Sequence, residues 1–124
     1  MKLRCTTNSV RIRIRRSELD VFDREGRISE EVHFPGGSVF ACILERIAGP
    51  SWEASMLDGT LRIGMPKIKA DAWMEPDRVG FEKQLPIPGK SAFLHLLIEK
   101  DFPCLHRPEE DKSDTFQDLA DRKE

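Results

Sequence analysis

The sequence predicts a mainly β (α+β) protein, made of two copies of a ββαββ unit that close into one β-barrel, followed by an acidic C-terminal tail with a short helix. Three observations predict this class: short segments that alternate apolar and polar residues, an apolar pattern that repeats, and turn residues between the segments. We expect one barrel domain over residues 1–107, with repeats at about 1–48 and 50–100, and a tail over residues 108–124.

Composition limits the class of protein. A chain of 124 residues fits one domain and needs no disulfides to hold its core. The three cysteines, Cys5, Cys42 and Cys104, are far apart and odd in number, which is typical of a reducing compartment. The N-terminal residues lack the apolar core of a signal peptide, and no segment is long enough to span a membrane. We therefore expect a cytoplasmic protein without membrane contact.

The apolar pattern repeats at a spacing of 51 residues, so that residues 8–35 align with residues 59–86 without a gap. After a loop that differs in length by two residues, residues 38–44 align with residues 91–97, which places His95 opposite Cys42. The apolar residues that keep their places are Val10/Leu61, Ile14/Met65, Phe22/Trp73, Ile28/Val79 and Phe34/Leu85. This repetition predicts that both halves fold as the same unit.

The first copy has the pattern strand, strand, helix, strand, strand. The expected ranges are 2–5, 10–14, 17–26, 27–34 and 39–47. Alternation in the first two strands places five residues in the core: Leu3, Cys5, Val10, Ile12 and Ile14. The helix has Ser17 as its expected cap and Gly26 at its end. The last strand is apolar on both faces, as in the centre of a sheet.

The second copy follows the same order. Its strands are expected at 52–57, 60–65, 78–85 and 92–100. Asp58 and Gly59 are typical of the tight turn between two paired strands. Pro66 suits the first turn of a helix, and the spacing places Ile68, Ala72 and Trp73 on its inner side.

Residues 59–86 read GTLRIGMPKIKADAWMEPDRVGFEKQLP. A turn glycine, an alternating strand, Pro66-Lys67 opening a short helix and an acidic Pro76-Asp77 turn resemble the AbrB/MazE/SpoVT swapped-hairpin barrel unit, mainly over residues 52–98. The resemblance implies that the two copies exchange hairpins within one pseudo-dimeric, swapped-hairpin-like β-barrel. The first copy departs from the family pattern, because Arg15-Arg16 stands where the family has Pro-Lys.

The two ends of the chain, MKLR…NSVRIRIRRSEL and LLIEKDFPCLHRPEEDKSDTF, resemble a family of small bacterial proteins without an assigned function. This resemblance spans nearly the full chain and implies no activity. The rest of the sequence adds no catalytic motif: Gly36-Gly37 lacks the lysine and the helix that follow a phosphate-binding loop.

Basic residues gather near the N-terminus and form the first candidate site. Residues 1–27 carry eight Lys and Arg against four Asp and Glu, whereas residues 101–124 carry four against eight. The AbrB-type resemblance implies that an exposed basic barrel face binds DNA, with binding that weakens steeply as salt rises. The candidate nucleic-acid-binding residues are Lys2, Arg4, Arg11, Arg13, Arg15 and Arg16.

The second copy does not repeat this charge, which disfavours a two-fold-symmetric grip on duplex DNA. Opposite Lys2, Arg4, Arg11, Arg13 and Arg15 stand Glu53, Ser55, Arg62, Gly64 and Pro66. The alternative is that the arginines form the solvated face of a strand, paired with Glu30, Glu31 or the acidic tail. We favour this alternative, with nucleic-acid binding as the second hypothesis.

Cys104 and His106 form the second candidate site. A thiolate and an imidazole are good zinc ligands, but zinc takes four ligands and this segment offers two good ones. A nearby imidazole also lowers the pKa of a thiol, which would activate Cys104 as a nucleophile. A metal or thiol site at Cys104 and His106 is therefore a third hypothesis. The alternative is that Phe102, Cys104 and Leu105 dock the outgoing chain onto the barrel.

These observations together predict a small intracellular binding or interaction module without catalytic chemistry and without a cofactor. Its expected partner is an unidentified protein or a second copy of the chain, and nucleic acid is the alternative partner. Residues 113–123 fit a short tail helix whose acidic charge suits it to cover the arginine face.

Overall fold

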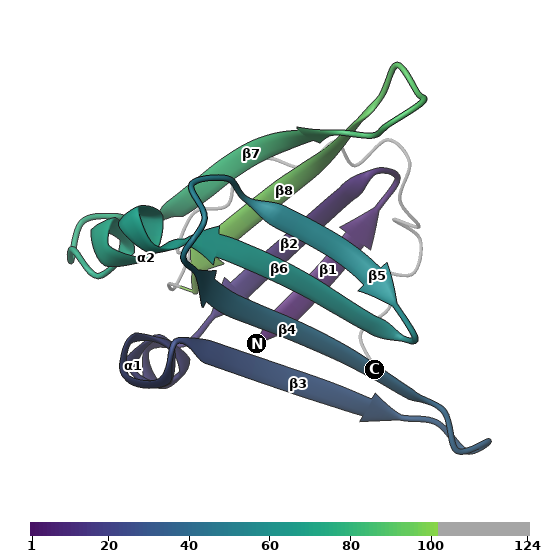
Figure 1. Cartoon of the computed structure of the whole chain (residues 1–124). Helices are drawn as coiled ribbons and strands as arrows, with labels where there is room; N and C mark the ends of the chain where they lie inside the picture. The colour runs from purple at the N-terminus through teal and green to yellow at the C-terminus, as the bar shows by residue number, and fades with distance from the viewer. Residues whose placement is uncertain (102–124) are drawn as a thin grey trace, which may run out of the picture.

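A computed structural model describes residues 1–101, which form two successive ββαββ halves (Figure 1). The first half contains β1 (Lys2–Thr6), β2 (Ser9–Ile14), α1 (Arg16–Glu25), β3 (Arg27–His33) and β4 (Val39–Ile47). The second half contains β5 (Glu53–Leu57), β6 (Thr60–Pro66), α2 (Lys67–Trp73), β7 (Gly80–Pro86) and β8 (Phe93–Lys100). The order of elements expected from the sequence is confirmed.

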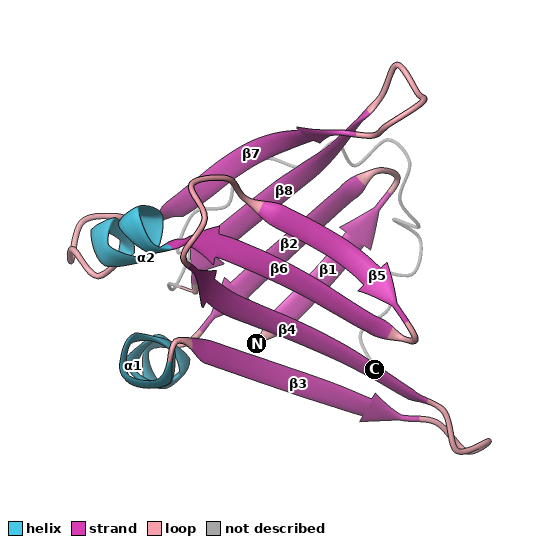
Figure 2. Cartoon of the chain, viewed as in Figure 1, coloured by secondary structure: helices cyan, strands magenta, loops and turns pink. Residues whose placement is uncertain are grey.

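The strands form two four-stranded sheets rather than the expected closed barrel (Figure 2). Sheet A has the order β1-β2-β8-β7, and sheet B has the order β3-β4-β6-β5. Each sheet joins one hairpin from each half through a central parallel pair, β2 with β8 in sheet A and β4 with β6 in sheet B. In residues 1–101 no ladder connects the edge strands of the two sheets, and the chain passes from one sheet to the other through a helix.

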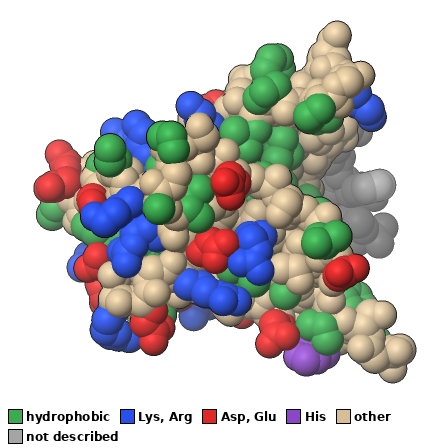
Figure 3. All heavy atoms as spheres, viewed as in Figure 1, with side chains coloured by type: hydrophobic (Ala, Val, Ile, Leu, Met, Phe, Trp, Pro, Cys, Tyr) green, Lys and Arg blue, Asp and Glu red, His purple; other side chains and the backbone are tan. Residues whose placement is uncertain are grey.

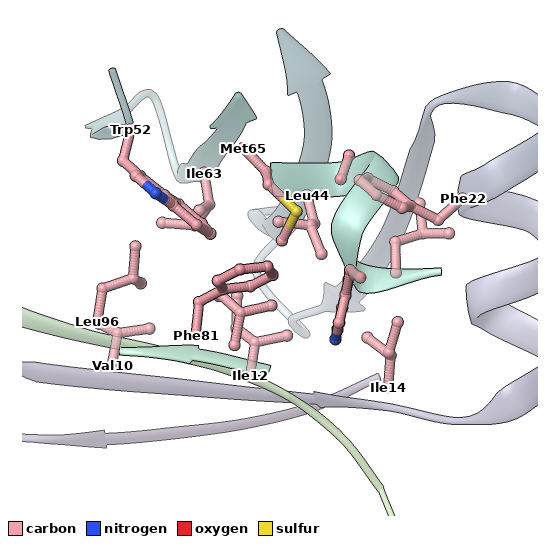
Figure 4. Packing of buried hydrophobic residues seen from close by; sticks show 14 of the residues in the cluster. Val10, Ile12, Ile14, Phe22, Leu44, Trp52, Ile63, Met65, Phe81 and Leu96 are labelled. Carbon is pink, nitrogen blue, oxygen red and sulfur yellow. The ribbon is translucent and has the colours of Figure 1, made fainter. Parts of the chain in front are cut away.

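The core lies between the two sheets and is built from their inward-facing residues (Figure 4). Sheet A contributes Ile12, Ile14 and Ile98, and sheet B contributes Leu44 and Ile63, all fully buried. Alternation along each strand brings these apolar residues to one face. The predicted inward face of the second strand, with Val10, Ile12 and Ile14, is therefore confirmed.

A row of aromatic rings connects the two halves across this core. Phe22 of α1 meets Trp73 of α2 edge-on with ring centroids 5.8 Å apart. Trp73 in turn lies 6.3 Å from Phe81 of β7, and Phe81 lies 5.5 Å from Trp52. Such tilted aromatic pairs add stability beyond the area that they bury. The row therefore holds both helices to the sheets at one end of the molecule (Figure 1).

The helix ends differ in detail from the expectation. Helix α1 begins two residues earlier than a cap at Ser17 would place it: Arg15 is the N-cap, and its backbone N–H donates to Oε1 of Glu18 at 2.8 Å. Gly26 ends the helix as expected, with a left-handed φ of 73°. In α2 the predicted inward position of Ile68 is wrong, since this side chain is 78% exposed while Ala70 is buried.

Strand register corrects the alignment of the two halves. Ile28 pairs with Leu44 in sheet B, and Phe81 pairs with Ile98 in sheet A, so Ile28 corresponds to Phe81 and not to Val79. The shift arises because the segment between helix and strand is longer in the second half. By the same comparison buried Cys42 corresponds to buried Leu96, and His95 lies on the outer face instead.

Candidate binding site on the outer face of sheet A

Four cations share the outer face of the hairpin formed by β1 and β2. In the antiparallel register Lys2 lies directly opposite Arg13, and Arg4 lies directly opposite Arg11. Their neighbours in sequence, Ile12 and Ile14, point into the core, so these four side chains project from the other face of sheet A. The alternating basic residues of the two strands therefore form one compact basic patch.

Both cross-strand pairs in this patch bring like charges together. Like charges directly opposite one another destabilise a pair of strands, on a scale of about 0.2–1 kcal/mol. The corresponding hairpin of sheet B avoids this arrangement, because Glu53 lies opposite Gly64 and Ser55 lies opposite Arg62. The ββαββ fold therefore does not require the repulsion that sheet A contains.

Two carboxylates at the end of β8 neutralise part of the patch. Nε of Arg11 lies 3.1 Å from Oε1 of Glu99, an ion-pair contact without the alignment of a hydrogen bond, and Nε of Arg13 lies 3.8 Å from the same oxygen. Lys2 contacts Asp101 at 2.9 Å, and this hydrogen bond holds the pKa of Asp101 below its usual value. Arg4 has no ion-pair partner among residues 1–101.

The observed counterions differ from the expected ones. Glu30 and Glu31 lie on β3, in the opposite sheet, and Glu30 instead approaches the N-terminal amino group at 3.3 Å. Sheet B carries an equivalent of the Arg11–Glu99 pair, since Arg62 contacts Glu45 at 2.9 Å. Figure 3 shows the molecule from the side of sheet B, where positive and negative side chains are interspersed.

A hollow of about 330 Å³ opens beside the patch, between the β1–β2 turn and β8. The described residues that line it are Arg4, Thr6, Ser9, Arg11, His95 and Leu97. At its rim Nε2 of His95 lies 2.6 Å from Oε1 of Glu82, which fixes the orientation of the imidazole ring. The hollow therefore gathers basic groups and hydroxyl groups at one place on an otherwise flat sheet.

Arg15 and Arg16, the remaining predicted basic residues, do not lie on this strand face. Strand β2 ends at Ile14, Arg15 caps α1 and Arg16 is its first helical residue. Both side chains are exposed. Cys104 and His106, the predicted metal or thiol residues, lie outside the described part of the chain. Within residues 1–101 no three His, Cys, Asp or Glu side chains gather as a metal site.

A larger hollow of about 590 Å³ lies between α1 and β3. It contains two carboxylates, but Glu18 is already held by the N-terminal amino group and by the backbone of Arg15. Burial raises the pKa of Glu18, and these two contacts outweigh it, so the pKa lies below its usual value. A carboxylate fixed in this way serves as a structural counterion of the N-terminus.

The two described cysteines lie in different environments. Cys42 is buried in the core, and burial raises the pKa of its thiol to about 11. A buried thiol with such a pKa stays protonated at neutral pH and is a poor nucleophile. Cys5 was expected in the core but is exposed; it lies on β1, an edge strand of sheet A whose residues are mostly exposed.

Sequence analysis missed three residues of the site: Glu99, Asp101 and Leu97. The parallel pairing of β2 with β8 places Glu99 beside Arg13 and Leu97 beside Arg11. Asp101 follows the end of this pair, where its backbone N–H donates to the carbonyl oxygen of Ile14 at 2.7 Å. The only local signal was the alternation of His95, Leu97 and Glu99 along β8. That signal predicts that the three side chains share one face of β8, but it does not predict which strand lies beside β8.

Two open sheets, packed face to face with a basic patch on one outer face, define a two-layer, mainly β protein. The chain belongs to DUF7009, a family of unknown function, which it matches over residues 1–119. No curated protein and no solved structure matches it. Neither of the helices described in residues 1–101 is long and apolar enough to cross a bilayer.

Proposed function

We propose that this protein is a binding module without catalytic chemistry, and that it binds an acidic segment of a partner protein on the outer face of sheet A. The observation that carries the proposal is the pair of like-charge contacts, Lys2 with Arg13 and Arg4 with Arg11. A sequence that departs from a local rule of stability without structural need often does so at a functional surface. Here the sheet B hairpin supplies the comparison without that departure.

The composition of the face supports a protein partner over nucleic acid. Phe93 is 52% exposed and lies on the same side of β8 as His95 and Leu97, so apolar surface borders the charges. Glu99 and Asp101 also lie at this face, so charges of both signs alternate on it, unlike the continuous basic stripe that tracks a nucleic-acid backbone. Protein interfaces commonly combine arginine, aromatic and apolar groups in this way.

The test is fluorescence anisotropy with the full chain and three labelled ligands: a glutamate-rich peptide, random duplex DNA and single-stranded RNA. Each is titrated at about 50 and 200 mM salt, since ionic binding weakens with salt. We expect the peptide to bind and the Arg4→Ser/Arg13→Gly variant, which gives sheet A the residues of sheet B, to lose at least tenfold in affinity. Arg62→Ala on sheet B is the matched control and should bind like the wild type.

A second candidate function is a nucleic-acid-binding regulator of the AbrB type, acting through the six basic residues Lys2, Arg4, Arg11, Arg13, Arg15 and Arg16. The exchange of hairpins between the two halves supports this alternative, as does the continuation of the positive charge onto Arg15 and Arg16 at the start of α1. Tight DNA or RNA binding that falls steeply with salt and is lost in the same variant would favour it. Flat traces with all three ligands would contradict both proposals.

A further inference from the structure

We propose that the hollow beside the β1–β2 turn is a pocket for a single phosphate group, carried as a phosphate monoester by the partner. The inference deepens the proposed function and rests on it, because the same face holds the partner. It names the chemical group that the partner carries and the place on sheet A where that group binds.

The pocket is built from two rows of side chains that cross the strands β1, β2 and β8 and are neighbours on the outer face of sheet A. In one row Thr6 lies opposite Ser9, and Ser9 lies beside His95 of β8. In the next row Arg4 lies opposite Arg11, which lies beside Leu97. Side chains of neighbouring rows on one face stand about 7 Å apart, so all of them reach a ligand placed between the rows.

The donors in these rows outnumber the acceptors of a carboxylate. Two guanidinium groups and two hydroxyl groups supply donors to the hollow, and the imidazole of His95 also lines it, with its Nε2 directed to Glu82. A carboxylate offers two oxygens, whereas a phosphate monoester offers three strong acceptor oxygens and a charge of about −1.5 to −2 at neutral pH. Guanidinium groups also match phosphate geometry with paired hydrogen bonds. The set of donors therefore favours phosphate.

The acidic residues near the pocket stand at its rim and not among the lining residues. Glu82 contacts His95 at 2.6 Å, which holds the ring in place beside Ser9. Glu99 lies one row further along β8 and contacts Arg11 through Nε. Arg4, on the edge strand β1, has no carboxylate partner in residues 1–101, so it supplies an uncompensated positive charge to the pocket.

Sheet B has the same strand register but lacks most of the hydrogen-bond donors at the corresponding positions. Register places Ser55 and Arg62 where sheet A has Arg4 and Arg11. It places Leu57 and Thr60 where sheet A has Thr6 and Ser9, and Ala41 beside Thr60 where His95 stands beside Ser9. Arg62 is the single cation of this set, and Glu45 already pairs with it. The pocket is therefore specific to sheet A.

The test is an NMR titration of the ¹⁵N-labelled full chain with inorganic phosphate, at constant pH and ionic strength. We expect saturable shifts of the Thr6, Ser9 and His95 amides. Arg4→Ser and His95→Ala should each weaken binding at least tenfold, and Arg62→Ala should leave it unchanged. Acetate at matched ionic strength should bind at least tenfold more weakly than phosphate.

Two results would overturn the inference: acetate binding as tightly as phosphate, or linear shifts spread equally over the cations of both sheets. A Glu109→Gln/Glu110→Gln/Asp111→Asn variant of the full chain tests competition by the chain's own carboxylates. Phosphate binding that appears only in this variant would support the pocket and would show that these three carboxylates compete with phosphate for it. If phosphate fails in every variant while the glutamate-rich peptide still binds, the pocket is wrong and the proposed function stands.

Discussion

The outer faces of sheets A and B share one feature and differ in the rest. Both have an arginine–glutamate pair at equivalent positions, Arg11 with Glu99 at 3.1 Å and Arg62 with Glu45 at 2.9 Å. This pair therefore belongs to the repeated unit. Around it sheet A adds Lys2, Arg4, Arg13 and His95, whereas sheet B has Glu53, Ser55, Gly64 and Ala41 at the matching positions.

This difference distinguishes charged residues that stabilise both sheets from charged residues of sheet A that are available to bind a partner. An exposed ion pair that both halves contain stabilises the sheet by a fraction of a kcal/mol and has no further meaning by itself. In sheet A the additional Lys2 and Arg13 lie opposite each other, and the additional Arg4 lies opposite Arg11; both like-charge pairs reduce the stability of the hairpin. We therefore interpret Arg11 as part of the ion pair that both sheets share, and Arg4 as a cation that distinguishes sheet A.

The largest expected effect concerns the inner faces, where the sheets should be equivalent. Ile12 and Ile63 occupy matching positions and are both fully buried. We expect Ile12→Ala and Ile63→Ala each to lower the free energy of unfolding by about 2–5 kcal/mol, because each leaves a cavity in the same core. Urea denaturation of both variants measures this. A loss at one site and none at the other would break the equivalence of the two sheets.

The next effect concerns the start of β7, where sheet A has Gly80 and sheet B has Arg27. A Cβ on Gly80 would lie 2.1 Å from the carbonyl oxygen of Ile98. Gly80→Ala should therefore displace β7 from β8 and cost about 3 kcal/mol. Thermal unfolding measures the loss.

Gly36→Ala is the control for this substitution, because nothing lies within 4 Å of the added atom. We expect it to change stability by less than about 0.5 kcal/mol. Equal effects of the two substitutions would show that strand β7 has room for a side chain. The close approach of β7 to β8 would then not distinguish sheet A.

The smallest effect tests the like-charge pairs directly. Arg4→Ser gives sheet A the residue of sheet B, and Ser55→Arg does the reverse. We expect Arg4→Ser to stabilise the protein by about 0.5 kcal/mol at low salt, and Ser55→Arg to destabilise it by a similar amount. Both changes should vanish at about 1 M salt, where screening acts over about 3 Å. Effects of the same sign in both variants would contradict the electrostatic explanation.

Local patterns predicted the elements because each element depends on neighbours in sequence. Alternation identified the strands, Gly26 ended α1, and Asp58-Gly59 formed the tight turn with left-handed φ values of 51° and 75°. Errors arose where a contact with another element decided the outcome. Ser17 was passed over as a cap because Glu18 reaches back to Arg15, and Glu18 is itself anchored by the N-terminus.

Spacing along the chain was enough to predict two ββαββ units, the core face of β2 and the basic character of the N-terminal hairpin, whereas the predicted core positions of Cys5 and Ile68 were wrong. Tertiary structure decided the rest. The parallel pairing of β2 with β8 and of β4 with β6 joins residues far apart in sequence, and it made two open sheets instead of a barrel. That same pairing brought Glu99, Leu97 and His95 beside the arginines, because a side chain acquires its neighbours only when strands from both halves share a sheet.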